Sequence, residues 1–185
     1  MSRQPGSRRS FLKFTSTAAA AGAVMPYWFS ATRSLADDAA KSPNERPRLG
    51  CIGTGDRWKQ VFRGASKFFT TLAVCDVDAN HAAEGKQIAG AANGEAGFPD
   101  QQIDVYEDYQ KILERDDIDV VTIVTPDHWH SKIAIEAMQA GKDIYCEKPL
   151  TLTINEGKQI CKVLKETGRV FQVGTQQRTE MGQRF

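Results

Sequence analysis

Short apolar runs alternate with longer amphipathic stretches along residues 48–174. The apolar runs predict six β-strands, at 48–52, 71–75, 104–106, 120–124, 143–146 and 170–173. The stretches between them predict helices at 58–67, 79–91, 109–114, 129–140 and 153–168. The run at 120–124 is apolar enough to be buried on both faces, as central parallel strands are. This alternation predicts an α/β fold with a doubly wound parallel sheet.

Capping residues mark the ends of the later helices. Thr153 and Glu156 form the pattern of a capping box at the start of the fifth helix. Gly141 and Gly168 follow the fourth and fifth helices, at the position where a left-handed residue ends a helix. Residues 90–97 are rich in glycine and predict a loop after the second helix.

The first 36 residues have the features of an export signal. Residues 7–13 are Ser-Arg-Arg-Ser-Phe-Leu-Lys, the pattern of a twin-arginine motif. An alanine-rich apolar run follows at 14–29, and Ser-Leu-Ala at 34–36 supplies the small residues that a signal peptidase recognises. We expect cleavage after Ala36 and export by the twin-arginine machinery to a bacterial periplasm. The alternative is a basic tail that contains a chance arginine pair.

Charge is unevenly distributed along the 185 residues. The chain carries 24 Lys and Arg against 23 Asp and Glu, a net charge of +1. Five of the basic residues and none of the acids lie in residues 1–36, which leaves 19 basic and 23 acidic residues and a net charge of −4. A mildly acidic body argues against a nucleic-acid partner. No apolar stretch is long enough for a stable membrane anchor.

The cysteines and histidines do not form a metal-binding pattern. The four cysteines are scattered and contain no C-x-x-C pair, and three of them lie in apolar runs, which favours buried free thiols over a disulfide framework. His128 and His130 form a His-x-His pair, but two ligands without a nearby third do not indicate a metal site. We expect a helix N-terminus there, with one histidine packed inward.

A glycine turn follows the first strand. Gly53 and Gly55 are spaced G-x-G, which lets a pyrophosphate approach main-chain N–H groups at a helix N-terminus. Asp76 ends the second strand 23 residues after Gly53, where a carboxylate binds the adenosine ribose and repels a 2′-phosphate. Together they predict a dinucleotide site that prefers NAD to NADP. Trp58 replaces the third glycine of the motif, so we expect a wider loop, or an indole lying along the cofactor or the domain surface.

Further motifs follow the later strands. Thr125-Pro126-x-x-x-His130 follows the fourth strand, and Glu147-Lys148-Pro149 follows the fifth. In register with the glycine turn and Asp76, they resemble the glucose–fructose oxidoreductase/inositol dehydrogenase (Gfo/Idh/MocA) family. Residues 174–178, Gly-Thr-Gln-Gln-Arg, resemble the crossover into that family's second domain. The resemblance covers residues 47–185 and implies a Rossmann-type dinucleotide-binding domain at 47–174.

The resemblance also implies which residues surround the NAD cofactor. Gly53 and Gly55 would hold the pyrophosphate, and Asp76 would bind the adenosine ribose. Pro126 and His130 would border the nicotinamide.

The same resemblance implies the catalytic residues. Lys148 would lie near the nicotinamide and the reacting hydroxyl of a sugar or polyol, where its ammonium would stabilise an alkoxide or relay a proton if burial lowers its pKa. Glu147 would orient the cofactor or Lys148, and Arg178 would reach the substrate pocket. The alternative for Lys148 is a solvated lysine before a turn proline.

Family members have a second α/β domain that supplies further catalytic residues, including a histidine. Residues 175–185 would be only its start, and no histidine follows His130. We therefore expect an N-terminal fragment or truncated gene product, lacking that second domain and inactive by itself. Residues 37–46 are polar and predict a linker between the signal and the domain.

The sequence favours one function over two alternatives. The favoured one is the NAD-binding domain of an exported oxidoreductase that acts on a sugar, polyol or related hydroxyl compound. The full-length protein could form a homo-oligomer. The alternatives are a glycosidase that oxidises its substrate transiently with NAD, and a non-catalytic nucleotide-binding module.

Overall fold

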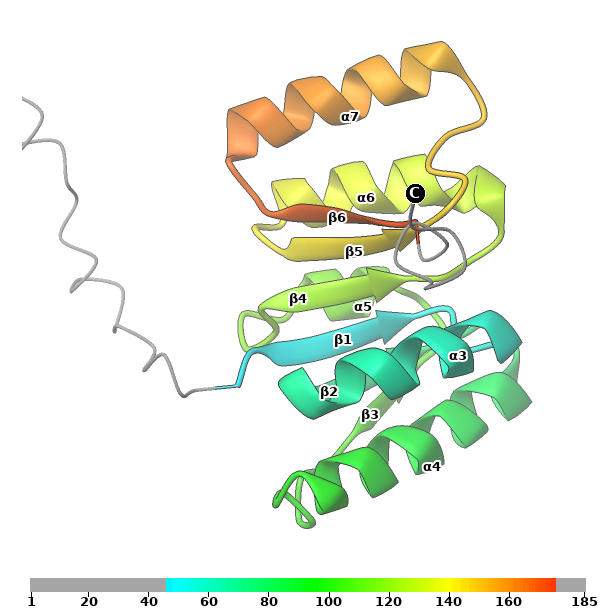
Figure 1. The fold of residues 1–185 in the computed structure, drawn as a ribbon, viewed down its shortest axis with the longest axis vertical. Coiled ribbons are helices and arrows are strands. Elements are labelled where there is room, and N and C mark those ends of the chain that lie inside the picture. The colour runs from blue at the N-terminus through cyan, green and yellow to red at the C-terminus, as the bar shows by residue number, and fades with distance from the viewer. Residues whose placement is uncertain (1–45, 176–185) are drawn as a thin grey trace, which may run out of the picture. The chain divides into compact units, whose positions relative to one another are not determined.

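The computed structural model describes residues 46–175 of the chain. Among these residues, six strands form one parallel sheet in the order β3-β2-β1-β4-β5-β6 (Figure 1). The strands are β1 (Arg48–Ile52), β2 (Thr70–Cys75), β3 (Asp104–Tyr106), β4 (Val120–Ile123), β5 (Asp143–Glu147) and β6 (Phe171–Gly174). All neighbouring strands pair in parallel, so the predicted doubly wound parallel sheet is confirmed. The predicted signal at 1–36, the linker residues 37–45 and Arg178 lie outside the described residues.

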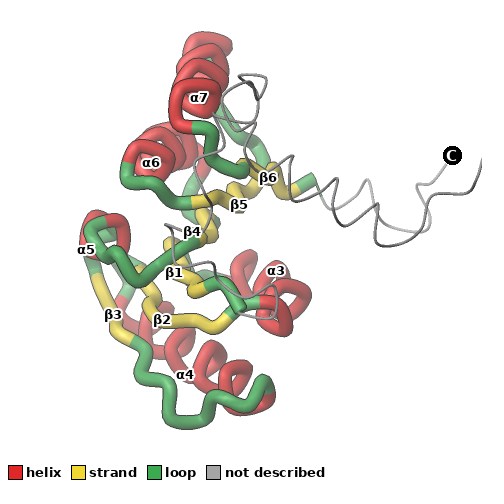
Figure 2. Tube along the Cα trace, turned by 90° about the vertical axis from the view of Figure 1, so that its left-hand side faces the viewer, coloured by secondary structure: helices red, strands yellow, loops and turns green. Residues whose placement is uncertain are grey.

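Helices cover both faces of this sheet, as the edge-on view in Figure 2 shows. One face carries α3 (Asp56–Ala65), the short η1 (Ser66–Phe68) and α4 (Ala79–Glu95). The other carries α5 (Gln110–Leu113), α6 (Asp127–Gln139) and α7 (Ile154–Thr167).

Side-chain alternation along β1 divides the core into two layers. Leu49 and Cys51 pack with Trp58 and Phe62 of α3 on one face. Ile52 joins the cluster under α5, α6 and α7 on the other face. Since successive side chains of a strand point to opposite faces, a continuous apolar strand supports both layers.

Trp58 lies in the core, and this corrects one expectation. Its side chain is 0% exposed and stacks on Phe62, with 4.5 Å between the ring centroids. The indole fills the space between α3 and the sheet, where burial of a large aromatic surface is strongly favourable. The expectation that Trp58 lies along a cofactor or the domain surface is therefore wrong.

The glycine-rich stretch at 90–97 also differs from prediction, because α4 continues through most of it to Glu95. The buried side chain of Asn93 explains this continuation. Its Oδ1 accepts from the main-chain N of Thr71 at 3.0 Å, and its Nδ2 donates to the Thr71 carbonyl at 2.8 Å. These bonds fix the end of α4 to β2 and outweigh the low helix propensity of glycine.

The predicted C-terminal ends of α6 and α7 and the capping box of α7 are confirmed, whereas α6 begins at Asp127, two residues before its predicted start. The capping box at the start of α7 is formed by Thr153 and Glu156. Gly141 and Gly168 follow the two helices with φ of 77° and 65°, the left-handed conformation that ends a helix.

Candidate functional site

A cleft of about 850 Å³ opens at the carboxyl ends of β1, β2 and β4. The strand order reverses between β1 and β4, and open α/β sheets bind ligands at such a reversal. Gly53, Gly55, Asp76 and Pro126 all line this cleft. Four of the residues singled out from the sequence are therefore brought together from three different strand ends.

The floor of the cleft is the glycine turn. Gly53 has φ of +81°, and a Cβ there would lie 2.6 Å from the carbonyl oxygen of Val124, so only glycine fits. Gly55 occupies the N-cap position of α3, and glycine has no side chain that could accept from the first N–H groups of the helix. The first N–H groups of α3 thus lack a side-chain cap, which suits them to bind an anionic group such as a pyrophosphate.

Asp76 fastens this turn from the end of β2. Its Oδ2 accepts from the main-chain N of Thr54 at 2.7 Å, and its Oδ1 accepts from the main-chain N of Asp78 at 3.0 Å. Oδ2 also lies 3.5 Å from the hydroxyl of Thr54, whereas Oδ1 has a further lone pair with which Asp76 can accept from a ribose hydroxyl. The contact with the turn could not be anticipated from the spacing of the motif alone.

The end of the cleft around Asp76 is acidic. Asp78, Glu107 and Asp108 line it as well. The main-chain N–H groups of Asn80 and His81 donate to Asp78 at the start of α4, and these bonds lower the pKa of its carboxyl. The concentration of carboxylates disfavours a 2′-phosphate at this end.

His130 lies beneath the surface of the cleft. Its side chain is 1% exposed, with Nδ1 2.7 Å from the carbonyl oxygen of Pro149 and Nε2 2.8 Å from that of Thr125. His128 is exposed, so the expected inward packing of one histidine is confirmed. The imidazole joins the segment after β4 to the segment after β5.

Aromatic residues that sequence reasoning did not select occupy the cleft wall instead. Trp129 is 41% exposed and lies edge-on to Tyr109, with 6.4 Å between the ring centroids. Both side chains line the cleft. An exposed tryptophan beside the His130 motif was the available signal, because large aromatic side chains at a surface often contact ligands.

Glu147 and Lys148 lie one strand further along the sheet. Glu147 is 2% exposed, and its Oε2 accepts from the main-chain N of Lys148 at 3.1 Å. Lys148 itself is exposed and does not line the cleft formed by the described residues. The burial on which the role expected of its ammonium depends is therefore not provided by residues 46–175.

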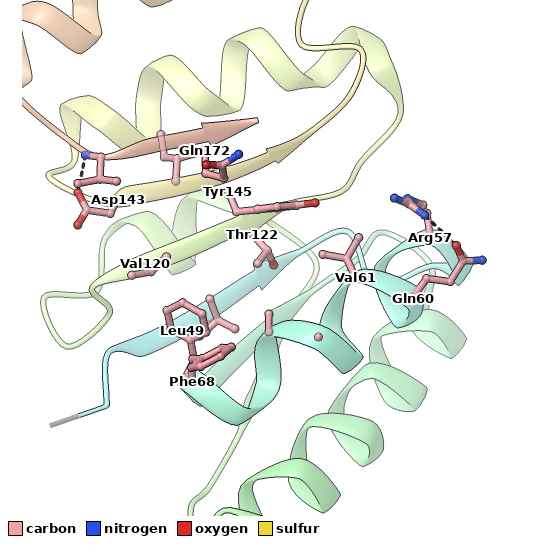
Figure 3. A pocket seen from close by; sticks show the side chains of 15 residues that line it. Leu49, Arg57, Gln60, Val61, Phe68, Val120, Thr122, Asp143, Tyr145 and Gln172 are labelled. Carbon is pink, nitrogen blue, oxygen red and sulfur yellow. Dashed lines mark hydrogen bonds between the residues drawn. The ribbon is translucent and has the colours of Figure 1, made fainter. Parts of the chain in front are cut away.

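Arg57 is a site residue that the sequence analysis missed. It lies in the first turn of α3, lines the cleft, and its Nη2 donates to Oε1 of Glu147 at 2.9 Å. Its side chain also reaches a second hollow, of about 680 Å³, that runs along α3 and the strand faces beside it (Figure 3). The walls of this groove are mostly apolar, with Leu49, Val61 and Val120 among them.

The sheet, the glycine turn and the carboxylate at the end of β2 define a dinucleotide-binding α/β domain. Residues 48–175 match the family described as "Oxidoreductase family, NAD-binding Rossmann fold" (GFO_IDH_MocA). The chain belongs to this family. The Rossmann-type fold and the NAD-binding class expected from the sequence are confirmed.

The proteins similar to this chain include two that are named as dehydrogenases and one that is named as a glycosyl hydrolase. A glycosyl hydrolase family 109 protein of Shewanella pealeana is 31% identical over 175 residues, which cover 86% of this chain and 37% of that protein. The crystal structure of myo-inositol 2-dehydrogenase from Lactobacillus plantarum has a TM-score of 0.60 and 28% identity, covering 74% of this chain and 38% of that one. A levoglucosan dehydrogenase in complex with NADH has a TM-score of 0.56 and 29% identity, over 72% and 36% of the two chains. The chain thus spans less than two fifths of the length of these relatives.

Within residues 46–175, no three or more His, Cys, Asp or Glu side chains are grouped so that they could hold a metal ion. None of the helices in that range combines the length and the apolar character needed to cross a membrane.

Proposed function

We propose that this chain is the NAD-binding part of an exported oxidoreductase that acts on a hydroxyl group of a sugar, polyol or related compound. The observation that carries the cofactor assignment is the bond between Asp76 and the main chain of the glycine turn. It joins the carboxylate expected at the ribose to the turn expected at the pyrophosphate. The names of the inositol and levoglucosan dehydrogenases support the substrate class.

The residues of the cleft fit NAD and divide its binding among them. The uncapped N-terminus of α3 would bind the pyrophosphate, and Asp76 would accept from the ribose hydroxyls. Trp129 and Pro126 would contact the cofactor along the wall of the cleft. Bound NAD would supply the acceptor for a hydride.

Lys148 is the residue that we assign to proton chemistry. Lys148 directly follows β5, which pairs with β4 in the sheet. The segment after β4 contains Pro126, which lines the cleft. The Lys148 ammonium would donate a hydrogen bond to the substrate oxygen and stabilise the negative charge that develops there while the hydroxyl proton passes to solvent water. Glu147 would position Lys148 through its main-chain N–H, and Arg178 would reach the substrate from beyond the described residues.

The test is cofactor binding by the chain, measured by NADH fluorescence titration. We expect saturable binding that Asp76→Ala weakens by about 10-fold or more, while Lys148→Ala leaves the Kd within about 2-fold. Lys148→Ala should abolish turnover in the full-length protein. If the protein binds NADH but Lys148→Ala causes no phenotype in the organism, a non-catalytic nucleotide-binding module is favoured instead.

A glycosidase is the second candidate, and the similarity to a family 109 glycosyl hydrolase over 86% of the chain favours it specifically. In this version the substrate is oxidised and later reduced again, so the net reaction is cleavage of a glycosidic bond by water. Incubation of the full-length protein with candidate glycosides and NAD separates the two. Accumulation of NADH with an oxidised product indicates a dehydrogenase, whereas sugar release without net NADH indicates a glycosidase.

Export is part of the proposal and rests on the motif at residues 7–13. Replacing Arg8 and Arg9 together by lysine should retain the protein in the cytoplasm with its N-terminal segment uncleaved. N-terminal sequencing of the exported wild-type protein should start at Asp37. A different start would move the cleavage site, and export of the double variant would contradict the twin-arginine route.

A further inference from the structure

Arg57 links the glycine turn to the Glu147-Lys148-Pro149 segment across 90 positions of sequence. Its guanidinium donates from Nη2 to Glu147 at 2.9 Å and from Nη1 to Oε1 of Gln60 at 2.8 Å. Its Nε is buried and makes no hydrogen bond within residues 46–175. The planar group is therefore held in one orientation by a strand residue on one side and by its own helix on the other.

Glu147 receives donors from three directions. Oε1 accepts from Arg57 and from the hydroxyl of Tyr145, at 2.9 and 3.1 Å, while Oε2 accepts from the main-chain N of Lys148. Burial, and then the neighbouring Glu147, raise the pKa of Tyr145 to about 12, so its hydroxyl remains a donor at neutral pH. A carboxylate buried to this degree needs its cation, because an isolated charge is costly away from water.

β6 leaves room for this network by carrying a glycine. Gly174 is paired with Glu147 in the sheet. A Cβ on Gly174 would lie 2.7 Å from Oε1 of Glu147 and 2.6 Å from the hydroxyl of Tyr145. Figure 3 shows the Tyr145 hydroxyl directed toward Arg57, and both residues line the groove along α3.

We propose that Arg57 is a positioning residue that couples occupancy of the glycine turn to the main-chain position of Lys148, through the carboxylate of Glu147. This inference rests on the proposed cofactor site. A pyrophosphate bound at the N-terminus of α3 restrains the first helical turn, which contains Arg57. The restraint passes to Glu147 and then to the N–H group of Lys148. Since coupling between sites is reciprocal, a displaced Glu147 also weakens cofactor binding.

The solvent-exchange rate of the Lys148 amide, measured by NMR on the ¹⁵N-labelled 185-residue chain, reports this coupling directly. In the wild type, saturating NADH should slow this exchange. In Arg57→Gln, exchange should be about 5-fold or more faster without cofactor, and NADH should slow it less. The NADH Kd should rise by about 5-fold or more. Arg63→Gln removes the same charge from an exposed position at the other end of α3 and should change none of these values.

Two further variants separate positioning from attraction of the phosphates by charge alone. Arg57→Lys keeps the charge but lacks the planar fork, so it should restore little of the Lys148 protection. In the double variant Arg57→Gln/Glu147→Gln, the exchange rate should match that of Glu147→Gln alone, because the two residues act in series. The double variant also leaves no uncompensated charge, so it covers the case in which Arg57→Gln does not fold.

The inference would be overturned if Arg57→Lys restored the wild-type NADH Kd while Arg57→Gln left the cofactor-free exchange rate of the Lys148 amide unchanged. That combination would show that Arg57 acts on the cofactor through its charge alone. Additive effects in the double variant would overturn the inference as well. If the wild type fails to bind NADH, the proposed function fails, while the cofactor-free exchange rates still establish whether Arg57 positions Lys148.

Discussion

Nδ1 of His130 lies 2.7 Å from the carbonyl oxygen of Pro149, which ties α6 to the segment that carries Lys148. The other ring nitrogen faces the carbonyl of Thr125 at 2.8 Å. Both partners are main-chain carbonyl oxygens, one in the segment after β4 and the other in the segment after β5. The histidine therefore acts on the loops around the cleft by holding their main chains together.

Replacing His130 by alanine should destabilise the domain by about 2 kcal/mol or more, because two carbonyl groups lose a partner and a cavity forms. Chemical denaturation followed by circular dichroism measures this change. His128→Ala, at an exposed position two residues earlier, should change the unfolding free energy by less than about 0.5 kcal/mol. Equal effects of the two substitutions would contradict a holding role for His130.

Replacing Asp76 by asparagine should relax the preference for NADH over NADPH by about 10-fold, or about 1.4 kcal/mol. Asparagine keeps an oxygen that accepts from Thr54 but removes the charge that repels a 2′-phosphate. Parallel titrations with NADH and NADPH give the ratio. Asp100→Asn, on an exposed loop after α4, serves as the control and should leave the ratio unchanged.

Gly53→Ala should destabilise the domain by about 2 kcal/mol or more, since the residue has a positive φ and its Cβ would meet the Val124 carbonyl. Gly64→Ala is the matched substitution, because Gly64 lies within α3 and a Cβ there meets nothing within 4 Å. It should stabilise the protein by about 0.5–1 kcal/mol through helix propensity. Melting temperatures that shift in opposite directions would support this account of the turn, and a tolerated Gly53→Ala would refute it.

The buried thiol of Cys51 should make stability depend on alkaline pH. Burial raises its pKa from 9.0 to about 12 in the folded protein. The folded state thus keeps a proton that the unfolded state releases, so this stabilising contribution is complete below about pH 9 and is lost as pH rises toward about 12. The unfolding free energy of Cys51→Ala should therefore fall less steeply between pH 8 and pH 10.5 than that of the wild type. Cys161→Ala, at an exposed position of α7, should follow the wild-type curve.

The sequence alone determined the order of strands and helices, because apolar periodicity and capping residues act over a few positions. β1 and β3 have the predicted bounds, and the capping box at Thr153 is present as predicted. The glycine turn and Asp76 could also be identified from the sequence. A sharp turn requires glycine, and the predicted end of the second strand places the Asp76 carboxylate at the same edge of the sheet as that turn. The matched family agrees with the class of protein that these residues indicate.

Tertiary structure alone decided where several side chains point. Periodicity did not show that His130 turns inward while Trp129 faces the cleft, or that Trp58 fills the layer beneath α3. The pairing of Arg57 with Glu147 joins residues 90 positions apart, and only the packing of α3 against the sheet brings them together. Local pattern determines which elements form, whereas the environment of each charge depends on neighbours that are distant in the chain.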